Sequence, residues 1–186
     1  MNPSLTSNKA ESVLTLPKLK ILTYPDEILT HTAKPLANID GRVQEMIDKM
    51  ALVMYGAPGV GLASIQVGWE ESLLIYDISV RDEKRELNVL VNPRIIESAG
   101  EMVSENEGCL SVPDYRSDVK RAERVLVEGF DRHGKPVRIE AEGLHAIVLQ
   151  HEMDHLNGKL FIDRISSLKR ELYKRRVRKA LRNSDD

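Results

Sequence analysis

Two histidines four residues apart could hold one metal ion. His151 and His155 enclose Glu152, Met153 and Asp154. On a helix, residues four apart share a face, so both imidazoles could bind the same cation while the Glu152 carboxylate stands beside it. A bound divalent metal lowers the pKa of water to about 7, and a nearby carboxylate can take the proton and later return it to the leaving group. The spacing therefore predicts a mononuclear hydrolytic metal site with its own general base.

The third ligand of such a site must come from elsewhere in the chain, because a catalytic ion of this type usually has three protein ligands and one open position. One class of zinc peptidase would place another histidine six residues after His155, where this chain has Phe161. Another class would use a downstream glutamate, but Glu171 lies in a run of Lys and Arg with which it can pair. Cys109, the only cysteine, is the best remaining candidate.

Cys109 lies between Gly108 and Pro113, in a segment whose composition predicts a bend with exposed backbone amides. A thiolate at such a bend can bind a metal while a neighbouring N–H points at the substrate. Two other interpretations are an inert, buried cysteine and a nucleophile activated by a histidine. The nucleophile needs only one base, so two imidazoles on one helix face argue against it.

A third segment, residues 59–68, is rich in glycine and other small residues that let another backbone lie close. Within it, Gln66 can offer its amide N–H₂ to a developing oxyanion. Glycines this close together could also indicate a phosphate-binding loop. The required Lys-Ser/Thr does not follow, however, and the spacing matches neither nucleotide-loop pattern.

These three segments, residues 59–66, 107–111 and 151–155, together resemble the motifs of peptide deformylase, in the same order along the chain. Members of that family are metal hydrolases that remove the formyl group from the N-terminal formylmethionine of new polypeptides. The flanking residues 21–26 and 156–161 look similar too, so the resemblance covers roughly residues 18 to 165. One departure is Ser64, where the family commonly has alanine. It puts fine substrate preference in doubt, but not the chemistry.

The resemblance implies a role for each residue of the site. The metal ligands would be Cys109, His151 and His155, and Glu152 would be the proton shuttle. Gln66 and the backbone amide of Leu110 would stabilise the oxyanion. The carbonyl of Gly61 would accept a hydrogen bond from the substrate's formamide N–H. The family metal is typically Fe²⁺, with Ni²⁺, Co²⁺ or Zn²⁺ able to occupy the site. The sequence alone does not choose among them, since imidazole and thiolate tolerate several divalent ions.

Apolar residues on the histidine side of the predicted helix could receive the methionine side chain. Leu144, Ile147 and Val148 lie seven, four and three residues before His151, so they share its face. An unbranched thioether suits such a wall. The alternative is that these residues face the core, which we expect for at least one of them. His145, off that face, receives no role.

The hydrophobic pattern predicts the elements that position these residues. A helix is expected over residues 42–55 and buried strands over 73–76 and 87–91, the second closed by Pro93. Residues 124–130 and 135–141 alternate around a turn that contains His133, which predicts a hairpin. The motif helix is expected over 142–156, with Asn157-Gly158 as its C-cap. We therefore predict an α+β fold, with antiparallel sheets around a central active-site helix and a basic helix at the C-terminus.

Length and composition indicate one compact enzyme domain. The 186 residues are 41% hydrophobic, without internal repeats. We expect a polar leader over residues 1–17, a catalytic domain over 18–165, and a basic C-terminal helix and tail over 166–186. No apolar run approaches the roughly 18 residues of a membrane span. A single cysteine that serves as a thiolate ligand needs reducing surroundings, so we expect a cytoplasmic protein with no membrane or DNA partner.

Positive charge is concentrated near the C-terminus. Residues 168–182 carry a net charge of +7, although the whole chain carries −2. Such a run is commonly a solvated helix face. It could instead contact RNA phosphates, and the resemblance supports this because some deformylases use a basic C-terminal helix to dock on the ribosome. Deleting residues after Ser167 should then spare activity on a short formylated peptide and weaken ribosome co-sedimentation.

Two other classes of function compete with deformylation. A general metallopeptidase would share the histidine helix, but would cleave internal peptide bonds and take its third ligand from Glu or His. A non-catalytic RNA-binding protein with a structural metal would need a closed site with four ligands. The chain has no second cysteine to complete one.

Overall fold

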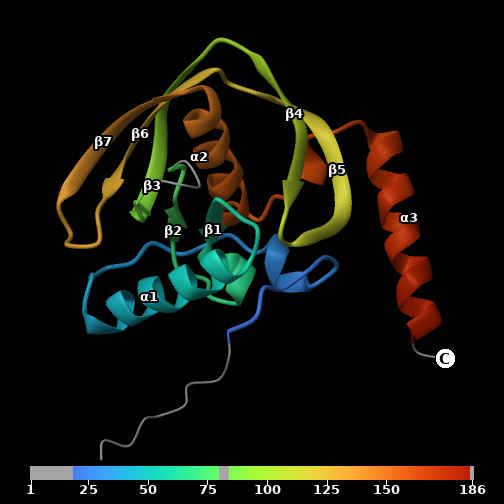
Figure 1. The fold of residues 1–186 in the computed structure, drawn as a ribbon, viewed down its shortest axis with the longest axis horizontal. Helices are drawn as coiled ribbons and strands as arrows, with labels where there is room; N and C mark the ends of the chain where they lie inside the picture. The colour runs from blue at the N-terminus through green and yellow to red at the C-terminus, as the bar shows by residue number, and fades with distance from the viewer. Residues whose placement is uncertain (1–18, 80–83, 185–186) are drawn as a thin grey trace, which may run out of the picture.

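The computed structural model describes residues 19–79 and 84–184. Within these ranges the chain forms an α+β fold, as predicted (Figure 1). The strands are β1 (Gly61–Ala63), β2 (Leu73–Tyr76), β3 (Asn88–Ala99), β4 (Met102–Cys109), β5 (Val112–Arg121), β6 (Arg124–Phe130) and β7 (Pro136–Glu142). The helices are α1 (Gly41–Gly56), α2 (Gly143–Leu156) and α3 (Ser167–Ser184), with short 3-10 helices η1 (Glu27–Thr30), η2 (Ser64–Val67) and η3 (Phe161–Asp163). The expected leader over residues 1–17 lies outside the described residues.

The strands form two antiparallel sheets with α2 between them. The five-stranded sheet has the order β1-β2-β3-β6-β7, and β4 pairs only with β5 in the second sheet. Figure 1 shows α2 in the space between the two sheets, α1 below the short strands β1 and β2, and α3 outside β5. One apolar cluster surrounds α2 and a second lies under α1. The predicted central helix is therefore confirmed.

The motif helix is buried on most sides, so its polar residues must find partners inside the protein. Nine of its fourteen residues are buried, including His151, Glu152, Asp154 and His155. Its last turn is followed by Asn157 as the C-cap and by Gly158, whose φ is +67°. A Cβ at Gly158 would also overlap the backbone carbonyl of Thr30. The predicted C-cap is thus confirmed, and glycine is required there.

The predictions for helix 42–55, strand 73–76 and the hairpin around residues 131–134 are confirmed as α1, β2 and the β6–β7 hairpin. The prediction that Pro93 closes a strand is wrong, because β3 continues through it to Ala99. The pairing with β6 shifts between Val91 and Arg94, and Asn92 there has a φ of +51°. Proline lacks an amide hydrogen, and a bulge leaves that position outside the hydrogen-bond ladder. The strand can therefore pass through it.

The basic C-terminal segment forms α3, which rests against the body of the protein through an aromatic cluster. Tyr173 is 3% exposed, and its ring centroid lies 5.8 Å from that of Tyr24 and 4.8 Å from that of Tyr115. The other face of α3 carries most of its charge and is exposed. Across the described residues, no helix has the length and apolar character that a membrane span requires.

Candidate metal centre

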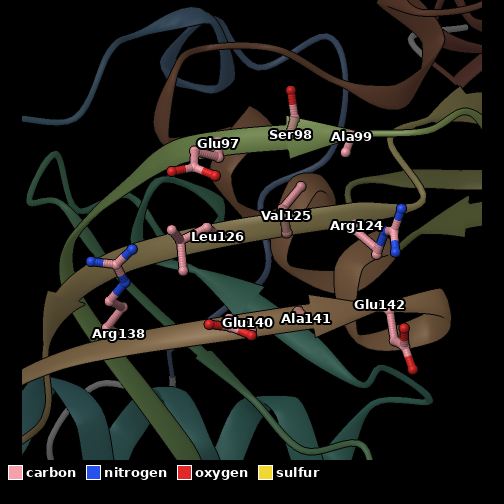
Figure 2. Close-up of a pocket in the computed structure, with 10 residues that line it drawn as sticks. All are labelled: Glu97, Ser98, Ala99, Arg124, Val125, Leu126, Arg138, Glu140, Ala141 and Glu142. Carbon is pink, nitrogen blue, oxygen red and sulfur yellow. The ribbon is translucent and has the colours of Figure 1, made fainter.

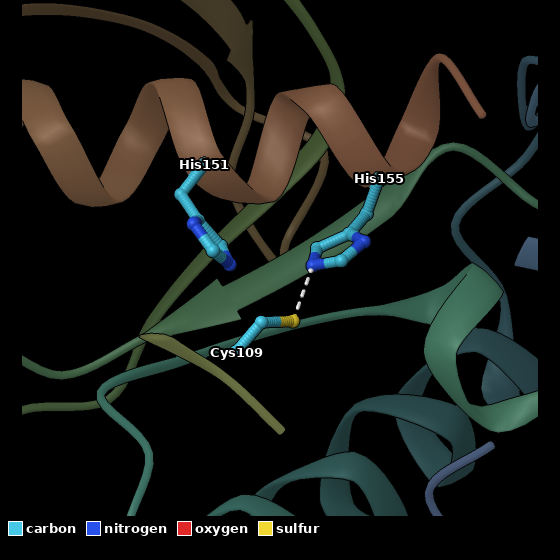
Figure 3. A group of neighbouring side chains, drawn as sticks. All are labelled: Cys109, His151 and His155. Atoms are coloured by element: carbon cyan, nitrogen blue, oxygen red, sulfur yellow. Dashed lines mark hydrogen bonds between the residues drawn. The ribbon is translucent and has the colours of Figure 1, made fainter. Parts of the chain in front are cut away.

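Three side chains from two elements converge beside α2. Cys109 Sγ lies 3.2 Å from His155 Nε2, and potential ligand atoms of Cys109, His151 and His155 all lie within 4.8 Å of one another. The two imidazole centroids are 5.0 Å apart. Figure 3 shows both rings projecting from one face of α2 toward the thiol. Soft thiolate and imidazole donors at this spacing fit one divalent transition-metal ion.

Cys109 reaches the helix because it ends β4 at a tight turn. It pairs across the hairpin with Val112, the first residue of β5, so Leu110 and Ser111 form the turn. The Ser111 amide donates a hydrogen bond to Cys109 Sγ at 3.3 Å. This hydrogen bond fixes the position of the sulfur that faces the two imidazoles. The bend predicted from glycine and proline is thus a hairpin turn.

His151 is oriented by a carboxylate from β4, the strand that also carries Cys109. Its Nδ1 lies 2.7 Å from Glu107 Oε1, an arrangement that makes Nδ1 the donor and leaves Nε2 for a cation. Burial lowers the pKa of His151, but hydrogen bonds to Cys109 and Glu107 outweigh burial and raise it well above its ordinary value. For Glu107, burial raises the pKa, whereas the bonds from His151 and Arg121 lower it to about 2. Glu107 therefore stays ionised.

His155 has the opposite electrostatic environment. Burial, together with the nearby His151 and Arg121, lowers the pKa of His155 well below its ordinary value. A neutral imidazole at this depth has a lone pair available for a metal. Among the described residues, buried polar atoms without a hydrogen-bond partner include His155 Nδ1 and Glu152 Oε2. The unpartnered Glu152 Oε2, beside a thiol and two imidazoles, supports solvent at this position, whereas His155 faces Cys109 through its other nitrogen, Nε2.

Glu152 lies next to the ligands, in a position that suits proton transfer. It is 5% exposed, and burial raises the pKa of its carboxyl group to about 7. Its carboxylate packs against Gly61, where any Cβ would overlap it. This contact explains why β1 begins with glycine. A carboxyl group with a pKa near neutrality can both accept and return a proton.

Gln66 is held beside Cys109 by hydrogen bonds at both ends of its amide. Its Oε1 accepts a hydrogen bond from the Ala63 amide at 2.8 Å. Its Nε2 donates to Ser111 Oγ at 3.1 Å and lies 3.7 Å from Cys109 Sγ. The amide N–H₂ is therefore fixed at the thiol side of the site. Leu110, in the adjoining turn, packs its side chain against Gly59.

The apolar residues proposed for the substrate side chain lie at different depths. Leu144 is 59% exposed and Ile147 is half-buried, whereas Val148 is 4% exposed and belongs to the cluster around α2. His145, which received no role from the sequence, has its Nε2 3.0 Å from the hydroxyl of Tyr76. Buried Ser64 donates a hydrogen bond to the Glu71 carbonyl, so its hydroxyl is satisfied inside the fold.

Sequence reasoning missed the charged residues that support the ligands. Glu107 and Asp154 lie inside the recognised motifs but received no role, and Arg121 was not singled out at all. Arg121 Nη2 lies 2.5 Å from Glu107 Oε1, and its Nη1 lies 2.6 Å from Asp154 Oδ2. The position of Asp154, one residue before His155, was the one feature of the sequence that could have indicated a role for it. Glu171 instead pairs with Arg178 at 3.9 Å.

A cavity on the five-stranded sheet is separate from this centre. It is a trough of about 710 Å³ on β3, β6 and β7, lined by Glu97, Ser98, Ala99, Arg124, Val125, Leu126, Arg138, Glu140, Ala141 and Glu142 (Figure 2). Arg124 pairs in register with Glu142 across two of these strands. None of the three converging ligands lines it, so its size does not identify the reactive site.

Comparison with known proteins agrees with the geometry. The family model for polypeptide deformylase matches residues 18–171. A peptide deformylase from Desulfosudis oleivorans is 57% identical over 89% of this chain and 96% of its own length. Another peptide deformylase, from Thermodesulfovibrio yellowstonii, is 50% identical over 86% of this chain and 96% of its own length. A crystal structure of a peptide deformylase from Legionella pneumophila has a TM-score of 0.81 and 49% identity, covering 89% of this chain and 96% of that one. The chain therefore belongs to the polypeptide deformylase family.

Proposed function

We propose that the Cys109, His151 and His155 centre hydrolyses the formamide bond of N-formylmethionyl polypeptides. Water adds to the formyl carbon, the C–N bond breaks, and formate and a free α-amino group are released. The observation that carries this proposal is the convergence of the three ligand side chains within 4.8 Å, with buried Glu152 beside them. Family membership supports the same reaction.

Cys109 Sγ and the Nε2 atoms of both histidines are the atoms that would hold the metal. The orientation of His151 by Glu107 supports this choice of nitrogen. When bound, a divalent ion in such a site polarises the carbonyl and makes water acidic enough to react near neutral pH. We propose Fe²⁺ as the ion in the cell, with Ni²⁺, Co²⁺ or Zn²⁺ as possible occupants.

Glu152 would move the proton. Its carboxylate accepts a proton from the attacking water and later gives it to the departing amine. The pKa of about 7 suits both steps, because a group that transfers protons both ways works best when its pKa lies near the operating pH. Its unpartnered Oε2 leaves one oxygen available for this role.

Gln66 Nε2 and the Leu110 amide would stabilise the negative charge that develops on the formyl oxygen. Gln66 cannot swing freely, since its amide is hydrogen-bonded to Ala63 and Ser111. Donors fixed in advance need no reorganisation as the charge develops. The Gly61 carbonyl would accept the substrate's N–H. Gly61 of β1 pairs with Tyr76 of β2. Because β1 is the edge strand of the five-stranded sheet, its other side is left for a peptide.

Leu144 and Ile147 would contact the methionine side chain, with Val148 forming the wall behind them. This division follows from their exposure, since Val148 is committed to the core while the other two retain accessible surface. A flexible thioether fills such an irregular apolar surface well.

The cellular setting follows from the ligand chemistry and from α3. A thiolate ligand persists in reducing surroundings, so we propose a cytoplasmic enzyme. Its substrates would be nascent formyl-methionyl chains, and the exposed basic face of α3 would contact the ribosome through RNA phosphates.

The test is formate release from a formyl-Met peptide, with metal content measured on the same anaerobic sample. We expect turnover on this peptide and none on the acetyl-Met counterpart. Cys109→Ala should lose the metal, whereas Glu171→Gln should retain metal and turnover. Loss of metal from Glu171→Gln, with Cys109→Ala intact, would contradict the proposed ligand set and favour a peptidase.

A further inference from the structure

Consecutive ion pairs connect the surface of the protein to His151. Arg164, which follows η3, pairs with both carboxylate oxygens of Asp154. Asp154 Oδ2 also accepts a hydrogen bond from Arg121 Nη1 at 2.6 Å. Arg121 in turn donates to both oxygens of Glu107, at 2.5 and 3.2 Å, and Glu107 Oε1 accepts from His151 Nδ1 at 2.7 Å. We call this series of residues the Arg164 relay.

The inner members of the Arg164 relay are largely shielded from water, although Asp154 borders a cleft together with Arg164. The side chain of Arg121 is 0% exposed, that of Glu107 is 6% and that of Asp154 is 8%, whereas Arg164 is 40% exposed. Two guanidinium groups and two carboxylates balance their charge. Removing one partner from a buried ion pair leaves an uncompensated charge, so the remaining groups must rearrange.

Arg121 is the point where a change at the surface would reach the site. Its guanidinium is divided between Glu107, which receives two hydrogen bonds, and Asp154, which receives one. Asp154 Oδ2 accepts from both arginines. Without Arg164, Asp154 would depend on Arg121 alone, and its attraction would draw the guanidinium away from Glu107. The hydrogen bond from His151 Nδ1 to Glu107 would then change.

We propose that Arg164 is a positioning residue for the metal ligand His151, acting through Asp154, Arg121 and Glu107. Among the described residues, the hydrogen bonds of its side chain go to Asp154 and not to the proposed ligands. It also lines a cleft of about 590 Å³ behind α2, so the outer end of the relay is accessible. The catalytic consequence rests on the proposed function, but the effect on His151 does not.

The experiment uses the chain loaded with Zn²⁺ as a diamagnetic probe ion. Arg164→Gln removes the positive charge. Arg164→Lys keeps the charge but loses the bidentate hydrogen bonding to Asp154. Arg132→Gln is the matched control, because Arg132 is 34% exposed and pairs with Asp48 at 3.0 Å, outside the relay. The readouts are the rate of zinc transfer to a chelator and the proton resonance of His151 Nδ1–H, with the thermal unfolding midpoint measured alongside.

We expect Arg164→Gln to release zinc about 3- to 10-fold faster, at or below the lower end of the 10- to 100-fold typical for a group that directly orients a ligand. The His151 Nδ1–H resonance should shift in Arg164→Gln. Both the zinc release rate and the resonance of Arg164→Lys should lie between those of the parent and of Arg164→Gln. Arg132→Gln should match the parent in both readouts. If Arg164 only ties η3 to α2, its loss will lower the unfolding midpoint with zinc release and the resonance unchanged. That result would overturn the proposal.

A double-mutant cycle tests the path. In a Glu107→Gln background, the additional effect of Arg164→Gln on zinc release should disappear, because the relay is already broken at its inner end. An undiminished effect would rule out transmission through Glu107. If Glu107→Gln fails to fold, the His151 resonance in Arg164→Gln still tests the proposal: a shift supports it and an unchanged resonance contradicts it. Neither readout uses a formylated peptide, so absent formate release would refute the proposed function without touching this one.

Discussion

Glu152 enters the site with one carboxylate oxygen that has no hydrogen-bond partner among the described residues. Replacing it by glutamine keeps the shape but removes the ability to accept and return a proton. We predict that Glu152→Gln retains its metal and loses 10²- to 10⁴-fold in turnover, the usual contribution of a positioned proton shuttle. Formate release and metal analysis check this, with Glu171→Gln as the control. Turnover within a few-fold of the parent would exclude Glu152 from proton transfer.

A second prediction at this scale concerns the metal. Ferrous iron and a thiolate are both oxidisable, so the iron-loaded enzyme should lose activity in air faster than a nickel-substituted sample. The measurement is the half-life of formate release under air, with both samples held under argon as the control. Equal half-lives would count against an oxidation-sensitive Fe²⁺ and Cys109 centre.

Residues could be placed from the sequence where their spacing is local. His151 and His155 share a helix face whatever the rest of the chain does, and Glu152 follows from the same geometry. Cys109 required elimination among other ligands. The relay was invisible because Arg121 meets partners 14 and 33 residues away, and no periodicity encodes a contact between separate elements.

At the scale of elements, glycines with positive φ lie at both ends of α2. Gly143 has a φ of +57° with open space around its Cβ position, whereas Gly158 has a φ of +67° and faces the Thr30 carbonyl. We predict that Gly143→Ala lowers the free energy of unfolding by about 1 kcal/mol, the cost of left-handed backbone. Gly158→Ala should cost about 3 kcal/mol, because overlap adds to that strain. Denaturant titration measures both, and equal losses would show that crowding is unimportant.

The strand containing Pro93 shows where reading elements from the sequence fails. A proline in an apolar run normally ends a strand, and the prediction followed that rule. The bulge at Asn92 depends on pairing with β6, more than thirty residues later in the chain. By contrast, the β6–β7 hairpin is local and its turn residues identify it. Local signals therefore predicted the hairpin correctly, whereas the end of β3 depends on a distant strand and could not be predicted from them.

The docking of α3 depends on one buried aromatic residue. Tyr173 is 3% exposed within the cluster that includes Tyr24 and Tyr115, whereas its neighbour Leu172 is 59% exposed. We predict that Tyr173→Ala lowers the free energy of unfolding by about 3 kcal/mol, as for large-to-small changes in a core. Leu172→Ala should change it by less than about 0.5 kcal/mol. Similar losses from both would mean that α3 is not held through Tyr173.

At the scale of the whole molecule, α3 is both a structural and a charged element, and this alters how a ribosome contact must be tested. Deleting residues after Ser167 would remove Tyr173 from the core together with the positive charge. Weaker co-sedimentation could then reflect unfolding. Substitutions confined to the exposed face separate the two effects. Within the described residues, Lys169, Arg175 and Lys179 are exposed side chains of α3 with no acidic partner within 4.0 Å.

We predict that changing these three cations to glutamine weakens ribosome co-sedimentation and lowers its salt dependence, while formate release from a short peptide stays within about twofold of the parent. Each lost phosphate contact should reduce the slope of log affinity against log salt by about 0.7 to 0.9. The control replaces Lys34, Lys120 and Lys135, exposed cations on the body, which makes the same change in net charge. If both triple variants bind ribosomes equally, the attraction depends on overall charge, and α3 has no specific role in it.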